Sequence, residues 1–114
     1  MAVADDDELV RGLVRTILTL HGYRVTLLAG AEEVLQGIGR EAWSLLIIDL
    51  HMPRRSGLEV IREIRRQGWS LPAILMSGLL TEDVVEECRR LDVECLPKPF
   101  EVDQLVQTVS RSLS

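Results

Sequence analysis

Apolar residues along this chain follow two spacings in turn, one typical of amphipathic helices and one typical of buried strands. Apolar residues three and four positions apart mark five helical stripes. The residues of these stripes are Leu9, Val10, Leu13, Val14, Ile17 and Leu18; Val34, Leu35 and Ile38; Leu58, Ile61 and Ile64; Val84, Val85, Cys88 and Leu91; and Val102, Leu105, Val106, Val109 and Leu113. Five short apolar runs alternate with the stripes, at Met1–Ala4, Val25–Leu28, Leu45–Ile48, Pro72–Met76 and Val93–Leu96. The pattern therefore predicts five strands and five helices in strict alternation.

Capping and turn residues indicate where several of these helices begin and end. Ser56 is followed three residues later by Glu59, which is the capping-box pattern of a helix start. Thr81 is in position to cap the helix that follows it. Three glycines follow helical stripes and predict helix ends, namely Gly22, Gly39 and Gly68.

Strict alternation with short connections predicts an α/β fold. We expect a doubly wound, five-stranded parallel sheet with right-handed crossovers and helices on both faces. The run Leu45–Ile48 is continuously apolar, as expected for a strand buried on both sides. The chain has 114 residues, enough for one sizeable core, and contains no linker or low-complexity segment. We therefore expect one domain that spans residues 1–114.

Composition excludes several classes of protein. A net charge of −5 argues against direct binding of nucleic acid, because phosphate backbones require a basic surface. No apolar run approaches the roughly 18–20 residues of a membrane span. The acidic start MAVADDDE is unlike a signal peptide. Cys88 and Cys95 have no metal-ligand spacing, so we expect two reduced cysteines and a cytoplasmic location.

The residues that follow the predicted strands carry the chemistry. Ligands of doubly wound sheets bind outside the carboxyl ends of the strands. The residues at these ends are Asp5, Asp6 and Asp7 after the first strand, Asp49 after the third, Ser77 after the fourth and Lys98 after the fifth. Lys98 is the only lysine among thirteen basic residues, and it lies between Pro97 and Pro99. Carboxylates, a hydroxyl and an ammonium group are therefore predicted to meet at one edge of the sheet.

Converging carboxylates repel one another unless a cation lies between them. Mg²⁺ suits such a site, because it prefers oxygen ligands and is usually held by one or two carboxylates and water. One carboxylate is then able to attack phosphorus and form an aspartyl phosphate. A hydroxyl and a fixed cation, here Ser77 and Lys98, would stabilise the charge on the transferred oxygens. The two prolines stiffen the backbone around Lys98, and the Lys98–Pro99 bond is a candidate for a cis peptide.

Four motifs carry a resemblance to a known family. They are VADDD at Val3–Asp7, LLIIDLHMPRRSG at Leu45–Gly57, AILMSG at Ala73–Gly78 and LPKPF at Leu96–Phe100. Each follows or includes a predicted strand, in the same order along the chain. Over essentially all 114 residues the chain resembles the CheY-like receiver domains of two-component response regulators.

This resemblance implies a flavodoxin-like sheet of order 2-1-3-4-5 and a role for each site residue. Asp49 would be the phosphoacceptor, and Ser77 and Lys98 the switch hydroxyl and the phosphate-binding lysine. Mg²⁺ would be bound by Asp6, by Asp49, by the backbone carbonyl of His51 and, through water, by Asp5. The phosphodonor would be a sensor histidine kinase. The output would pass through the face formed by the fourth strand, fourth helix, fifth strand and fifth helix. Such a domain is a signalling module and catalyses only its own phosphorylation and dephosphorylation.

The sequence departs from the family pattern at three places. Cys95 occupies the position, three before the lysine, where many receivers have an aromatic switch residue. The segment Leu91–Cys95 is one residue shorter than usual. The first strand is abrupt, which indicates either a very short native start or a domain cut from a longer chain.

Two rival functions come from other classes. A haloacid-dehalogenase-like phosphohydrolase would share the aspartyl-phosphate chemistry, but it typically needs a second acidic residue where this chain has His51. A binding module that no longer needs phosphate is favoured only by Cys95. A flavin-binding domain is disfavoured, since the first loop is acidic. Among the other polar residues, Asp7 is expected only to start a helix, and Arg54 and Arg55 to lie in a solvated loop.

Overall fold

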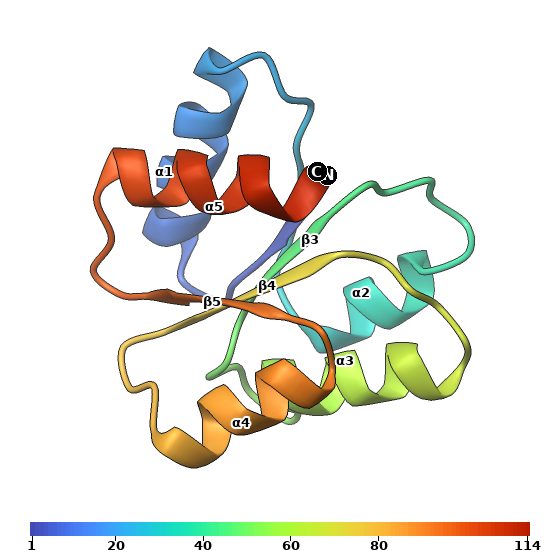
Figure 1. The fold of residues 1–114 in the computed structure, drawn as a ribbon. Coiled ribbons are helices and arrows are strands. Elements are labelled where there is room, and N and C mark those ends of the chain that lie inside the picture. The colour runs from blue at the N-terminus through green and yellow to red at the C-terminus, as the bar shows by residue number, and fades with distance from the viewer.

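The computed structural model describes residues 1–114 as five strands and five helices that alternate along the chain (Figure 1). The strands are β1 (Ala2–Ala4), β2 (Thr26–Leu28), β3 (Leu46–Asp49), β4 (Ala73–Ser77) and β5 (Glu94–Pro97). The helices are α1 (Glu8–Leu20), α2 (Ala31–Gly37), α3 (Gly57–Arg66), α4 (Glu82–Arg90) and α5 (Val102–Leu113). All neighbouring strands are parallel and the sheet order is β2-β1-β3-β4-β5. The fold expected from the sequence is confirmed.

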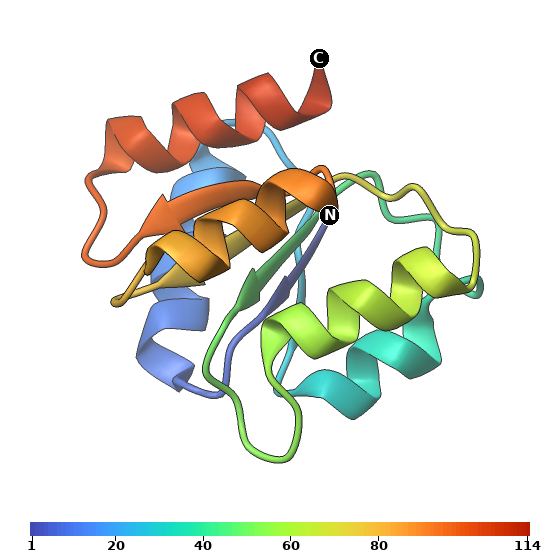
Figure 2. The same cartoon turned by 60° about the horizontal axis from the view of Figure 1, so that its bottom comes forward.

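Helices cover both faces of the sheet and enclose two apolar cores. Helices α1 and α5 lie on one face, and α2, α3 and α4 lie on the other (Figures 1 and 2). Successive side chains of a strand point to opposite faces. Ile47 of β3 therefore packs with the core under α1 and α5, while Leu46 and Ile48 pack with the core on the other side. The continuous apolar run in β3 is explained by this two-sided burial.

The predicted helix boundaries are largely confirmed. Ser56 and Glu59 form the capping box of α3, with Glu59 N donating to Ser56 Oγ at 3.2 Å. Thr81 caps α4 and Asp7 caps α1, each through its side-chain oxygen. The second helix ends at Gly37, two residues before the predicted Gly39, and an isolated bridge from Ile38 to Glu41 follows. No helix is long and apolar enough to cross a membrane.

Only part of the apolar stripe of α1 is buried against the rest of the protein. Val14, Ile17 and Leu18 are buried in the core beneath α5. Leu9 and Leu13 repeat at the same helical spacing, but their exposed fractions are 84% and 54%. Periodicity located the helix correctly and did not distinguish its covered side from its exposed side.

The start of α3 passes very close to the end of β3. A Cβ atom at Gly57 would lie 2.4 Å from the backbone oxygen of Asp49 and 2.9 Å from Leu75 Cδ1. The Gly57 N–H also donates to Leu50 O at 2.9 Å, which fixes this approach. Glycine is therefore required here by space, because any side chain would push Asp49 out of place.

We predict that Gly57→Ala destabilises the protein by about 1–3 kcal/mol, the usual cost of forcing an extra methyl group into a packed site. Urea unfolding followed by circular dichroism measures this change. The matched control is Gly12→Ala within α1, where an added Cβ meets no atom within 4 Å. That exchange should stabilise the protein by about 1 kcal/mol, the difference in helix propensity. Equal stability of the two variants would contradict the steric role of Gly57.

Candidate functional site

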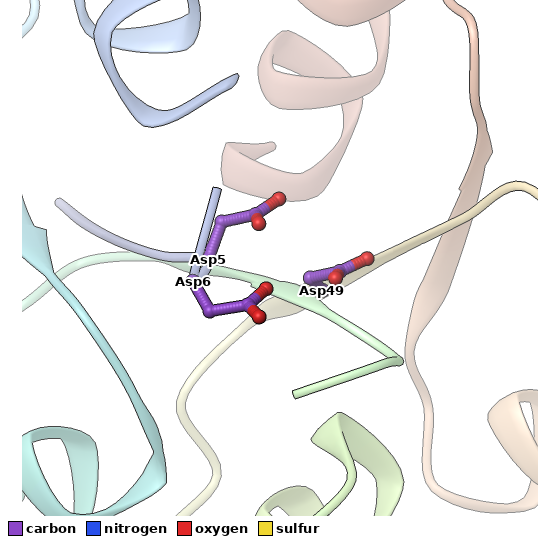
Figure 3. A group of neighbouring side chains, drawn as sticks. All are labelled: Asp5, Asp6 and Asp49. Atoms are coloured by element: carbon purple, nitrogen blue, oxygen red, sulfur yellow. The ribbon is translucent and has the colours of Figure 1, made fainter. Parts of the chain in front are cut away.

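Three carboxylates lie together at the carboxyl ends of β1 and β3. Asp5 and Asp6 directly follow β1, and Asp49 is the last residue of β3. One carboxylate oxygen from each residue lies within 4.8 Å of those of the other two (Figure 3). Asp5 is fully buried and Asp49 is 6% exposed, while Asp6 is exposed. The predicted convergence of the first and third strand ends is therefore present.

The ammonium group of Lys98 lies between two of these carboxylates. Lys98 Nζ is 2.8 Å from Asp5 Oδ2 and 3.0 Å from Asp49 Oδ1. Its backbone N–H donates to Ser77 O at 2.8 Å, which anchors Lys98 to the end of β4. The Lys98–Pro99 peptide bond is cis, as the sequence suggested. The side chain of Lys98, in the loop after β5, thus connects Asp5 after β1 with Asp49 at the end of β3.

The remaining contacts of Asp5 use most of its acceptor capacity. Its Oδ1 accepts from the backbone N–H of Asp7 at 2.9 Å, while Oδ2 accepts from Lys98. The backbone oxygen of Asp5 accepts from Arg11 Nη1 at 2.7 Å. Asp6, in contrast, makes no hydrogen bond or ion pair with protein atoms, and its oxygens are available to a ligand. The contact of Arg11 with Asp5 was not predicted from the sequence, because no sequence motif connects an arginine on this helix with the acidic cluster.

Ser77 is buried at the end of β4, but its hydroxyl faces its own loop. Ser77 Oγ donates to Leu79 O at 3.1 Å and accepts from Leu79 N at 3.0 Å. The sequence predicted that Ser77 lies at the end of the fourth strand, as it does. It did not predict the pair of hydrogen bonds with Leu79. Leu79, whose backbone makes both bonds, is 65% exposed. The side chain of His51 is also exposed.

Burial and charge act in opposite directions on the site. Burial raises the pKa of Asp49, the hydrogen bond from Lys98 lowers it, and the charge of Asp5 raises it again, with a net upward shift. Burial alone would lower the pKa of Lys98, but hydrogen bonds to Asp5 and Asp49 raise it overall. Lys98 therefore stays charged, while ionisation of Asp49 is less favourable in the folded protein than in the unfolded chain.

The donor atoms of the cluster fit a hard divalent cation. Three carboxylates and one ammonium group leave an excess of two negative charges when all are ionised. All three residues offer carboxylate oxygens, and the carboxylate of Asp6 is exposed and has no partner in the protein. Mg²⁺ prefers such ligands and keeps several waters in sites with few protein donors. Cysteine, which softer metals prefer, is absent from the cluster.

Comparisons with known proteins agree on one family. The family described as response regulator receiver domain matches residues 1–110. Response regulator MprA of Mycobacterium leprae is 35% identical over 108 residues, which make up 92% of this chain and 46% of that protein. The chain thus spans about half the length of the curated relatives that it matches.

Solved structures support the same assignment. The receiver domain of Francisella response regulator 1452 is 26% identical, with a TM-score of 0.91 over 98% of this chain and 93% of that one. The receiver domain of NtrX from Brucella abortus is 29% identical, with a TM-score of 0.89 over 98% of this chain and 96% of that one.

We predict that Asp49→Asn raises the melting temperature of the metal-free protein at neutral pH. Because the pKa of Asp49 is raised by folding, the folded state holds its proton more tightly than the unfolded chain does. The stability gained from this proton is present at acid pH and is lost as pH rises through the folded pKa. Removing the ionised group should therefore raise the melting temperature by several degrees. In a small domain each kcal/mol of added stability raises it by about 4–8 °C.

Adding Mg²⁺ should reverse this difference between wild type and Asp49→Asn. A cation bound to Asp49 stabilises the wild type, whereas the variant lacks one charged ligand. Calorimetry at increasing Mg²⁺, with EDTA as the metal-free reference, measures both effects. Asp7→Asn is the control, since Asn caps a helix as well as Asp and Asp7 lies outside the cluster. Equal stabilisation of wild type and Asp49→Asn by Mg²⁺ would contradict the metal site.

Proposed function

Because the chain belongs to the response regulator receiver domains, we propose that Asp49 accepts a phosphoryl group from the phosphohistidine of a sensor histidine kinase. The observation that carries this proposal is the bridge of Lys98 between Asp5 and Asp49, beside the unpaired Asp6. The bridge lies at the carboxyl edge of a parallel sheet, where a bound group is open to solvent and to a protein donor.

Asp49 is suited to act as the nucleophile. Its Oδ1 is paired with Lys98, and its other oxygen has no protein partner and is available to attack phosphorus. In the transfer a bond forms between that oxygen and phosphorus, and the phosphorus–nitrogen bond of the donor breaks. The electron pair of the broken bond stays on the departing imidazole. The product at Asp49 is an acyl phosphate.

Asp6 and Asp49 would hold a Mg²⁺ ion together with the backbone carbonyl of His51, and Asp5 would act through water. Asp5 fits this indirect role, since its two carboxylate oxygens are already engaged by Asp7 N and Lys98. When bound, the ion supplies positive charge that offsets the repulsion between the carboxylates and an incoming phosphoryl group.

Lys98 and Ser77 are proposed to bind the oxygens of the transferred group. Lys98 already contacts Asp49, so a phosphoryl group there would meet its ammonium with little movement. Ser77 must first leave both of its hydrogen bonds with Leu79. Phosphorylation would thereby release the loop of residues 78–81, and this loop leads into α4. We propose that the signal then leaves through the face of β4, α4, β5 and α5.

The same proposal covers the wider setting of the domain. Response regulators act with histidine kinases and output domains, and this domain would contact a downstream partner, with no nucleic acid bound by the domain itself and no membrane. Its reaction is limited to its own phosphorylation and dephosphorylation. We propose a cytoplasmic location, consistent with two free cysteines.

Phosphorylation is tested with acetyl phosphate and Mg²⁺. We expect one phosphoryl group on the wild type, removed by hydroxylamine as an acyl phosphate, and none on Asp49→Asn. Intact mass spectrometry measures both results. Asp7→Asn should be labelled normally and serves as the control. Labelling that persists in Asp49→Asn would contradict the assignment of the acceptor, and turnover of unrelated phosphate esters would favour a hydrolase.

Coupling to the loop is tested with Lys98→Arg. Arginine keeps the charge but presents a broad planar fork in place of a compact ammonium group. We expect the variant to bind Mg²⁺, while the amide shifts of residues 77–81 caused by beryllofluoride fall several-fold below those of the wild type. Arg111→Lys, a charge-preserving exchange at the exposed pair with Glu94, is the control. An unchanged loop response in Lys98→Arg would remove Lys98 from the coupling.

A further inference from the structure

The two cysteines of the chain lie together where α4 packs against β5. Cys88 is on α4, is 1% exposed and belongs to the core beneath α2, α3 and α4. Cys95 is on β5, is partly exposed and packs against that same core. Cys95 also lines a surface hollow of about 380 Å³, together with Val85 of α4. One thiol is therefore buried and its neighbour has access to solvent.

A tight chain reversal holds these two elements together. Val93 N donates to Cys88 O at 2.8 Å directly after the end of α4. Asp92, with φ of 58°, adopts the left-handed conformation that this turn requires. The reversal aligns β5 beneath α4 and brings Cys88 and Cys95 against the same apolar core. Both cysteines are free, so the pair is a reduced dithiol.

We propose that Cys88 and Cys95 are a modification site, at which a small-molecule disulfide such as oxidised glutathione converts the dithiol into a reversible intramolecular disulfide between α4 and β5. Disulfides in a reducing compartment are usually transient and redox-sensing. Separation by only seven positions and direct packing of the two elements favour a bond within one chain over a bond between chains.

The chemistry is a pair of thiol–disulfide exchanges. Cys95 attacks one sulfur of oxidised glutathione, so that a mixed disulfide forms and one glutathione leaves. Cys88 then attacks the sulfur of Cys95 and releases the second glutathione. The two thiol protons pass to the two glutathione thiolates, and the two electrons that the protein loses reduce the oxidant.

The order of the two exchanges follows from the surroundings of each thiol. Burial, with a contribution from the neighbouring Cys95 thiol, raises the pKa of the Cys88 thiol to about 12. A thiolate is the attacking species, so Cys88 is a poor first nucleophile. Cys95 is the thiol that an oxidant is able to reach. Once the mixed disulfide is formed, Cys88 needs no access to solvent, because its target is its own neighbour.

The disulfide would also act on the output surface, a consequence that rests on the proposed function. A covalent bond between α4 and β5 would restrict their relative movement, and both belong to the face proposed to change upon phosphorylation. The oxidised domain would accept the phosphoryl group at Asp49 but respond weakly at α4 and β5. Cys95 would then add a second input at the position where related receivers often have an aromatic residue.

The modification is tested on the folded, reduced protein with oxidised glutathione alone. Exchange is stopped with acid, and the remaining thiols are then blocked with N-ethylmaleimide in denaturant at neutral pH and counted by intact mass spectrometry. We expect the wild type to lose both reactive thiols, retain no glutathione and recover both thiols with dithiothreitol. Cys95→Ser should keep a reactive Cys88 and gain no glutathione. Cys88→Ala should retain one glutathione on Cys95.

Several results would overturn the proposal. These are two thiols that remain after treatment, a stable glutathione adduct on wild-type Cys95, or disulfide-linked pairs of chains. If Cys88→Ala does not fold, the wild type and Cys95→Ser still decide between these outcomes. None of these measurements uses a phosphodonor, so they stand or fall separately from the phosphoacceptor function.

The effect on output is tested by comparing amide shifts caused by beryllofluoride in the reduced and oxidised wild type. We expect shifts around Asp49 in both forms, and a several-fold smaller response of α4 and β5 in the oxidised form. An equal response of α4 and β5 in the two forms would overturn the effect on output. Absence of any response around Asp49 in the reduced form would count against the proposed function and leave the disulfide unaffected.

Discussion

The site depends on one constraint, which is that carboxylates from two strands share a single ammonium group. Asp5 and Lys98 are 93 positions apart in sequence, yet their charged atoms are 2.8 Å apart. Breaking a buried ion pair by removing one partner typically costs about 3–5 kcal/mol, because a charge is left without compensation. Lys98 thus compensates the negative charge of Asp5 and Asp49 at the sheet edge. The remaining negative charge makes the edge receptive to a cation.

The rest of the fold serves to keep these groups in register. Apolar cores on both faces fix β1 and β3, and Asp5 and Asp49 lie at the carboxyl ends of these strands. The tight contact of Gly57 with the backbone of Asp49 and the bond from Lys98 N to Ser77 O fix the remaining sides. Side chains held by packed elements reorganise little when a ligand binds, which favours binding of developing charge.

The alternation of apolar patterns was sufficient to predict the five strands, the five helices and the parallel sheet, while the strand order came from the family resemblance. The convergence of Asp5, Asp49 and Lys98 followed from the rule that strand ends share an edge. Three features of the structure could not be predicted from the pattern of apolar and polar residues. Exposure of Leu9 and Leu13 depends on the width of the covering surface, the contact of Arg11 with Asp5 depends on a rotamer, and the orientation of Ser77 depends on its loop. Each is decided by three-dimensional packing, and periodicity carries no information on it.

The orientation of Ser77 bears on how a small residue at position 95 is tolerated. Many receivers that the sequence resembles have an aromatic residue at this position, and Cys95 is much smaller. Here the hydroxyl of Ser77 holds both backbone groups of Leu79, so its movement toward a phosphoryl group would by itself free the loop before α4. Because each backbone group released must find a new partner or water, the loop would settle into a second arrangement. A bistable loop of this kind would transmit the state of Asp49 without a ring at position 95, and it would leave the Cys95 thiol available for a different use.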